Sequence, residues 1–233
     1  MRRSLVVSLA VLAIVRSQAA AQTCQGLASY SAGQLQVAAN AQFPEARKVW
    51  GGSISYGLAS GIYGGADLST TSFDAPAGVD APSSLGIGAH AGYQMKLGRT
   101  GKMALCPVAS LALGMGPDDD DANLNGSSRD IHLGLALGTE MGASKQMRII
   151  PTAGLGLQSF KFTEENTQND NSVEVSETYA LARLGVGFVF NQQISVRPTV
   201  DIPLGSDLSN DPTFGISVGY NFGSKGVSKA RRH

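Results

Sequence analysis

Hydrophobic and polar side chains alternate along most of the chain, and the alternation is sharpest in residues 213–222. There Phe214, Ile216, Val218, Tyr220 and Phe222 alternate with small or polar residues. A side-chain period of two predicts a β-strand. A soluble barrel would turn the large apolar face inward, whereas a membrane barrel turns it toward lipid and keeps small and polar groups inside. The stretch is therefore interpreted as a strand of an inside-out barrel.

Similar alternation recurs along the chain and predicts further strands of the same kind. With the C-terminal stretch, the predicted strands are residues 33–43, 48–58, 61–70, 85–97, 102–114, 130–142, 146–160, 176–190, 193–203 and 213–222. Each is about ten residues long, the length that a tilted strand needs to cross a bilayer. A bulge or an end of pairing is expected near Ser159, because Phe160 and Phe162 are out of phase. A barrel of eight strands, in which the first or third segment serves otherwise, is the alternative.

The predicted connections alternate between short and long. Short ones follow the second, fourth, sixth and eighth strands, and longer ones, at 71–84, 115–129, 161–175 and 204–211, follow the third, fifth, seventh and ninth. Short periplasmic turns and long extracellular loops are typical of outer-membrane barrels. Only the link at 44–47 is short where a long one is expected. Aromatic residues gather near the strand ends, as membrane interfaces favour: Tyr56, Tyr93, Phe188, Phe190, Tyr220 and Phe222 toward the short turns, and Phe43, Trp50 and Phe214 toward the other end.

The first 21 residues have the pattern of a secretory signal peptide. Arg2 and Arg3 form a basic region, residues 5–15 an apolar run, and residues 19–21 an A-x-A cleavage site, so the mature chain is expected to begin at Gln22. A membrane anchor is the alternative, but about 11 apolar residues are too few to span a bilayer. Thr23 argues against lipid attachment at Cys24. The rest of the chain then divides into an N-terminal periplasmic segment at 22–32, the barrel at 33–222 and a basic tail at 223–233.

Charge and hydropathy restrict the function classes. The chain has 18 Lys and Arg against 18 Asp and Glu, and loss of the leader removes Arg2, Arg3 and Arg16, which leaves 15 − 18 = −3. That balance gives no indication of nucleic-acid binding. No apolar run after the leader is long enough for a membrane helix, so the mature chain would enter a membrane as a closed sheet.

The leader, the alternating runs, the unequal turns and the closing G-Y-N-F of residues 219–222 resemble the small bacterial outer-membrane β-barrel proteins. The resemblance implies an all-β, antiparallel, up-and-down transmembrane β-barrel in the cell outer membrane. It also implies contact with outer-membrane lipid, lipopolysaccharide and the barrel assembly machinery, a monomer, and no cofactor. The family usually ends on the closing aromatic residue, whereas here Phe222 is followed by GSKGVSKARRH.

Ionisable residues of both signs fall on the predicted inner face. A charge on the lipid face costs about 2–4 kcal/mol near the midplane, which favours the lumen for all of them. They form either a structural network of ion pairs and hydrogen bonds or the lining of a narrow polar pore. The set comprises Asp67, His90, Lys96, His132, Glu140, Arg148, Arg183, Arg197 and Asp201.

The two cysteines, Cys24 and Cys106, enter an oxidising compartment if the chain is exported. Cys106 points inward near the short-turn end of the barrel, and Cys24 precedes the first strand. A disulfide that tethers the N-terminal segment inside the barrel is one reading, and two unrelated thiols is the other.

Two further candidates for chemistry lie toward the long loops. The acidic run Asp118, Asp119, Asp120 and Asp121 is either a solvated rim or a weak site for divalent cations that bridge to lipopolysaccharide, since hard cations prefer oxygen ligands. Asp130 and His132 share a face and could activate water.

No second acidic pair and no Ser–His–acid arrangement is evident in the sequence. We therefore predict no enzyme activity, and because no EF-hand spacing is present we predict no bound metal. The expected role is a structural or narrow porin-like barrel, with a loop-based adhesin or ligand-binding barrel as the alternative and an outer-membrane hydrolase as a weaker one.

Overall fold

The computed structural model describes residues 23–26, 33–45, 47–58, 61–74, 83–98, 102–116, 124–141, 146–166, 168, 171–208 and 211–222. The predicted leader, the acidic run 118–121 and the tail 223–233 lie outside the described residues.

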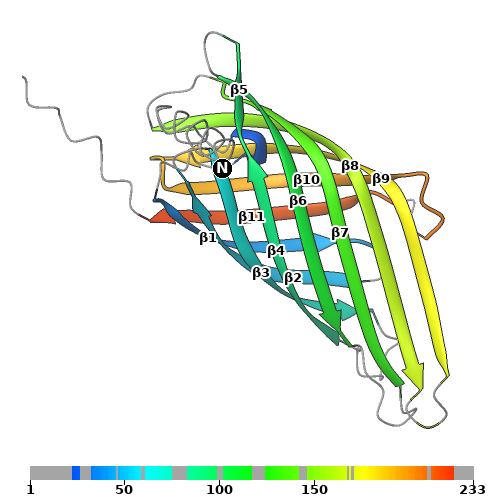
Figure 1. Ribbon diagram of the computed structural model, residues 1–233. Helices are drawn as coiled ribbons and strands as arrows, with labels where there is room; N and C mark the ends of the chain where they lie inside the picture. The colour runs from blue at the N-terminus through cyan, green and yellow to red at the C-terminus, as the bar shows by residue number, and fades with distance from the viewer. Residues whose placement is uncertain are drawn as a thin grey trace, which may run out of the picture.

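The described chain forms one antiparallel sheet that closes on itself (Figure 1). Consecutive strands pair with each other, apart from β4 and β5, and β1 pairs with β11 from Leu35↔Phe222 to Phe43↔Phe214, which closes the barrel. A single turn of 3-10 helix, η1 (Thr23–Gln25), precedes the sheet. The strands are β1 (Leu35–Phe43), β2 (Arg47–Gly57), β3 (Ile62–Phe73), β4 (Ser83–Tyr93), β5 (Met95–Leu97), β6 (Met103–Met115), β7 (Leu124–Thr139), β8 (Met147–Asn166), β9 (Ser172–Phe190), β10 (Ile194–Leu204) and β11 (Thr213–Phe222).

The eleven assigned strands make a barrel of ten, because β4 and β5 are two parts of one strand. Both pair with β6 in the same register, Gly92↔Val108 on one side of the interruption and Met95↔Leu105 on the other. The interruption falls at Gln94, whose backbone N–H donates to the carbonyl of Gly61 at 3.0 Å. The prediction of ten antiparallel strands is confirmed, and the alternative of eight is wrong.

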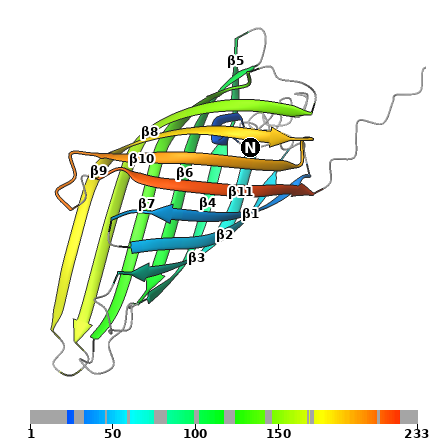
Figure 2. The same cartoon turned by 180° about the vertical axis from the view of Figure 1, so that it is seen from behind.

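We call the end of the barrel where β9 turns into β10 the short-turn rim; β1 begins and β11 ends there as well. The opposite end is the long-loop rim. At the short-turn rim the β9–β10 turn is tight enough to place Asn191 and Gln192 at positive φ. At the long-loop rim, β7, β8 and β9 project well past the other strands (Figures 1 and 2). We call this three-stranded projection, residues 124–130, 160–166 and 172–179, the ribbon.

The expected bulge near Ser159 is wrong. The pairing of β8 with β7 and with β9 continues without a change of register through Ile131↔Ser159 and Ser159↔Thr178. Phe160 and Phe162 nevertheless have the opposite phase from Leu155 and Leu157, because the strand leaves the lipid there. Beyond lipid the outer face meets water, so the apolar residues shift to the inner face. The outer face of the ribbon instead carries Lys161 and Glu174, which form an ion pair at 2.6 Å.

Within the barrel wall the distribution of polarity is inverted relative to a soluble protein. Large apolar side chains of every long strand are exposed on the outside, among them Ile54, Leu68, Ile87, Leu135 and Val218, while Gln36, Ser195, Ser217 and Asn221 are buried inside. Among the described residues, no helix is long and apolar enough to cross a membrane. The inward-polar, outward-apolar arrangement is the one that lipid requires of a barrel.

Exposed aromatic rings mark two levels on the outer surface. Tyr220 and Phe222 meet edge to face with ring centroids 4.8 Å apart at the short-turn rim, and Phe43 meets Trp50 at 5.9 Å toward the long loops. Amphipathic rings at two levels are the anchors that membrane interfaces favour.

Candidate functional site

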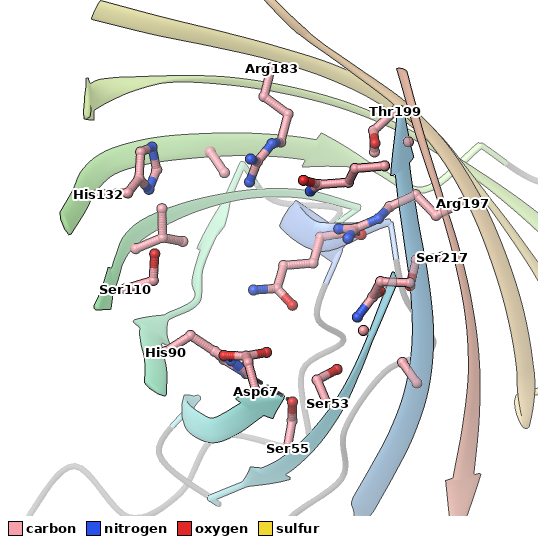
Figure 3. Close-up of a pocket in the computed structure, with 18 of the residues that line it drawn as sticks. Ser53, Ser55, Asp67, His90, Ser110, His132, Arg183, Arg197, Thr199 and Ser217 are labelled. Atoms are coloured by element: carbon pink, nitrogen blue, oxygen red, sulfur yellow. Dashed lines mark hydrogen bonds and ion pairs between the residues drawn. The ribbon is translucent and has the colours of Figure 1, made fainter. Parts of the chain in front are cut away.

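The barrel encloses a cavity of about 390 Å³ that is lined from nearly all the strands. Its labelled side chains converge on a common space in Figure 3, and each of them carries a hydroxyl, imidazole, carboxylate or guanidinium group. The lumen is therefore a polar chamber and not a packed apolar core. The labelled lining residues are Ser53, Ser55, Asp67, His90, Ser110, His132, Arg183, Arg197, Thr199 and Ser217.

Inward glycines make room for the larger lumen side chains. A Cβ added at Gly65 would lie 2.7 Å from Cε1 and Nε2 of His90, and a Cβ at Gly156 would lie 2.6 Å from Nε2 of His132. Each imidazole thus lies over a position without a side chain and can reach across a neighbouring strand. The abundance of glycine in these strands reflects this close approach as well as open volume.

Asp67, His90 and Ser55 form one hydrogen-bonded chain. Asp67 Oδ2 is 2.7 Å from His90 Nδ1, and His90 Nε2 is 2.9 Å from Ser55 Oγ. The register brings them together, because Ser55 pairs with Gly65 on β3 and Gly65 pairs with His90 on β4. The ring of His90 therefore crosses over Gly65 to reach the next strand.

Arg183 and Asp201 form the second lumen pair, between neighbouring strands β9 and β10. Arg183 donates from Nε and Nη2 to the two carboxylate oxygens of Asp201, each at 2.6 Å. This two-point geometry is the strong form of an arginine–carboxylate contact. The Arg183 side chain still keeps 45% of its surface exposed, which shows that space in the lumen borders it.

The remaining predicted lumen residues are more dispersed. Arg148 and Glu140 form a longer ion pair of 3.4 Å near the short-turn rim. His132 lines the cavity over Gly156. Lys96 lies on β5 beyond the interruption at Gln94, where it is exposed and is not part of the cavity wall.

The N-terminal segment contacts the inner wall of the barrel and contributes to the lining of the lumen. Cys24 in η1 forms a disulfide with Cys106 on β6, and both are buried together with Ala104. Gln25 Nε2 donates to Tyr63 Oη at 2.9 Å, and Arg197 donates to the Gln25 carbonyl at 2.5 Å. We call residues 23–26 the plug.

The carbonyl of Gly26 packs directly on Gly187, where any Cβ would overlap it. The plug is thus held to the wall at several points, by a disulfide, by hydrogen bonds from two sides, and by backbone contact on β9.

Asp130 and His132 have different surroundings in the structure. Asp130 accepts a hydrogen bond from Gln158, which lies opposite His132 on β8, while His132 lines the cavity. The geometry therefore gives no support to a water-activating pair at this place. Among the described residues, no group of three or more His, Cys, Asp or Glu side chains is arranged to hold a metal ion.

Carboxylates at the long-loop rim contact the chain segment that links β10 to β11. Glu177 accepts hydrogen bonds from the Ser206 hydroxyl at 2.7 Å and from the Asp207 backbone N–H at 2.5 Å, and these bonds lower the pKa of Glu177 below its ordinary value. Glu45 has a raised pKa, because it shares a hydrogen bond with Asp211 and lies close to that like charge. The link from β10 to β11 is therefore held to the ribbon through Glu177.

Sequence reasoning missed Ser55, Tyr63 and Gln25 as parts of the lumen site. Ser55 has the inward parity of β2, so the alternation places it inside, but only the register shows that it meets His90. The expectation that no Ser–His–acid arrangement is present is corrected by the hydrogen-bonded chain of Ser55, His90 and Asp67. Tyr63 lies across the inward-facing Gly92, where a Cβ would overlap its ring, and no local pattern signals this contact.

A closed antiparallel barrel with lipid-facing apolar residues and a polar lumen is the architecture of outer-membrane β-barrel proteins. Residues 7–222 match the family model described as outer membrane protein beta-barrel domain, and the chain belongs to that family. No curated protein matches the sequence.

Solved structures of similar architecture include three bacterial barrels. The N-terminal β-barrel domain of Pseudomonas aeruginosa OprF is 16% identical, with 82% of this chain and 98% of that chain covered and a TM-score of 0.36. Ail, the attachment invasion locus protein of Yersinia pestis, is 12% identical, with 82% and 99% covered and a TM-score of 0.39. The translocator domain of the autotransporter NalP from Neisseria meningitidis is 14% identical, with 81% and 87% covered and a TM-score of 0.48. Likenesses at these values carry no argument about activity.

Proposed function

We propose that this protein is a narrow, porin-like barrel of the outer membrane, whose lumen is closed at the short-turn rim by the plug. The observation that carries the proposal is the polar cavity of about 390 Å³, whose lining includes residues 24 and 25 of the plug. A purely structural barrel of this strand number could fill its interior with side chains. Here the side chains of the wall leave a chamber instead.

The charged side chains that border the lumen are compatible with the passage of small polar solutes. Arg183 and Asp67 both border the cavity with a large part of their side chains exposed, and each has a partner of opposite charge or an imidazole beside it. Paired charges of both signs orient polar molecules without a strong preference for anions or cations. The proposed conduit would therefore have weak charge selectivity.

Removal of the plug is expected to raise the single-channel conductance in planar bilayers several-fold over the unaltered protein. The variant lacks residues 23–26 and carries Cys106→Ala, so that no free thiol remains in the opened mouth. The full-length variant Cys24→Ala/Cys106→Ala is the matched control, because it loses the disulfide but keeps the contacts of Gln25 and Gly26 with the wall. Equal conductance of the deleted and full-length forms would contradict a plugged conduit.

A role in surface contact is the second candidate, and the ribbon favours it. Pairing of β9 with β10 ends at Ala180↔Leu204, whereas β9 begins at Ser172. The edge of β9 from 172 to 179 therefore has no β10 partner along it, although Glu177 binds residues 206 and 207. Val173 on this edge is 64% exposed. An extended edge of this kind can accept a strand from another protein.

Adhesion of cells that display the protein to immobilised extracellular-matrix proteins tests the second candidate. Val173→Lys is expected to reduce adhesion, because a lysine on an edge strand opposes strand addition. Leu208→Lys, in the link between β10 and β11, adds the same charge at another exposed position and is expected to leave adhesion unchanged. Equal adhesion of both variants and the unaltered protein would exclude strand addition at this edge.

A further inference from the structure

Three lumen side chains on neighbouring strands have the connectivity of a nucleophile, its base and an orienting acid. Ser55 on β2, His90 on β4 and Asp67 on β3 all border the cavity (Figure 3). The distance from Ser55 Oγ to His90 Nε2 is 2.9 Å, and that from His90 Nδ1 to Asp67 Oδ2 is 2.7 Å. Both distances lie in the hydrogen-bond range that links a nucleophile to its base and the base to the group that orients it.

The carboxylate fixes the tautomer of the neutral imidazole. An ionised carboxylate only accepts hydrogen bonds, so its contact with Nδ1 places the ring proton on that nitrogen. The lone pair of Nε2 is then left to accept the proton of the Ser55 hydroxyl. Asp67 thus prepares His90 to act as a base toward Ser55. In histidine, the hydrogen bond made by one ring nitrogen commonly decides the protonation of the other.

Gly65 makes the arrangement possible and holds the ring in place. It separates Ser55 from His90 in the sheet register, and a Cβ there would lie 2.7 Å from Cε1 and Nε2 of the imidazole. The ring therefore lies against the wall of the barrel and has little freedom to turn away from Ser55. A base held at one position next to its nucleophile is the geometric requirement for general-base catalysis.

We propose that Ser55, His90 and Asp67 form an acyl-transfer site in the lumen, which takes the acyl group from small carboxylic esters. Ser55 is the nucleophile, His90 is the general base, and Asp67 is a positioning residue that acts through His90. The proposal is independent of whether the lumen conducts.

The reaction needs only the ester and water. The Ser55 oxygen forms a bond to the ester carbonyl carbon while its proton moves to His90 Nε2. The bond from that carbon to the alcohol oxygen then breaks, and the alcohol leaves with the proton. Water next attacks the acyl-serine with His90 again as base, which releases the carboxylic acid and returns the proton to Ser55.

The lumen sets the size and the route of the substrate. The plug lies on the wall of the chamber of about 390 Å³, so an ester is expected to enter from the opposite, long-loop rim. Ser55 borders the chamber but is only 6% exposed, which restricts the acyl group to a short one. Esters with long acyl chains would not fit between the wall and the His90 ring.

A small fluorophosphonate is the probe, since it forms a stable bond with an activated serine. The folded full-length protein in detergent is expected to gain one adduct by intact mass, and peptide mapping is expected to place it on Ser55. Ser55→Ala should abolish this adduct, and His90→Asn should slow its formation by about 100-fold or more, the contribution that a positioned base makes. The same variants should lose turnover of a short-chain nitrophenyl ester.

Ser53→Ala is the matched control, because Ser53 lies two residues away on the same strand and also borders the cavity. It is expected to label at the unaltered rate. Asp67→Asn should slow labelling, and Asp67→Glu should restore part of the labelling rate. If gel mobility and circular dichroism show that His90→Asn does not fold, the two Asp67 variants test the proposal in its place. An unlabelled folded protein, an adduct elsewhere, a rate unchanged in the His90 and Asp67 variants, or an equal loss in Ser53→Ala would overturn the proposal.

Discussion

Replacing Cys106 with alanine is expected to lower the free energy of unfolding by about 4–5 kcal/mol. The disulfide joins residues that are 82 positions apart, so it closes a long loop in the unfolded chain and removes much of that chain's entropy. Urea or guanidinium titration in detergent measures the change. Trp50, the one tryptophan of the chain, lies exposed on the outer face and reports its transfer from detergent to water.

The double variant Cys24→Ala/Cys106→Ala separates the cross-link from the packing of the two sulfur atoms. Either single variant already breaks the disulfide, so the double variant is expected to lose little more than each single one. Residues in direct contact that act as a unit show this kind of non-additivity. If the two single losses add up in the double variant, the cysteines stabilise the barrel through independent packing and the cross-link account is wrong.

Much of this fold follows from the alternation of side chains along the strands. Where lipid covers the outer face, as at Leu133, Leu135 and Leu137 on β7, the apolar positions must recur every second residue, and the period of two marks the strand. The sequence therefore predicts the number of barrel strands and the direction of most lumen residues. The predicted ends of β7, β8 and β9 at the long-loop rim were wrong, because apolar side chains face outward only where lipid covers the strand. Beyond that boundary the apolar residues Phe160 and Phe162 face inward. A prediction that assumes one constant alternation along the strand therefore interprets the change of face as the end of the strand.

The contacts inside the lumen depend on register, which alternation does not determine. Parity alone places Ser55, Asp67 and His90 on the inner face, but a shift of β3 against β4 by two residues would keep that parity and separate His90 from Ser55. Lys96 shows that alternation also does not determine the position of a residue along the barrel axis. It has the alternation of an inner-face residue, but it lies beyond Gln94 and is exposed at the rim. The inner face could be predicted from the sequence, and its pairs could not.

Placing an arginine on the lipid face at the middle of β11 is expected to be strongly destabilising. Val218 lies midway between Phe214 and Phe222, faces outward, and is 47% exposed. Val218→Arg should lower the free energy of unfolding by about 2–4 kcal/mol, because a guanidinium at the bilayer midplane loses its hydration. Denaturant titration in lipid vesicles, followed by Trp50 fluorescence, measures the loss.

Leu204→Arg is the matched control, since Leu204 is 46% exposed and ends β10 at the long-loop rim. Near the interface the same change should cost only about 0–1 kcal/mol, because the side chain can extend to water. The difference between the two variants therefore reports depth in the bilayer and not the loss of an apolar contact, which is similar at both sites. Equal losses of unfolding free energy in the two variants would place Val218 in contact with water. The outer face of the barrel would then not be the face that lipid covers, and the inverted arrangement would be wrong.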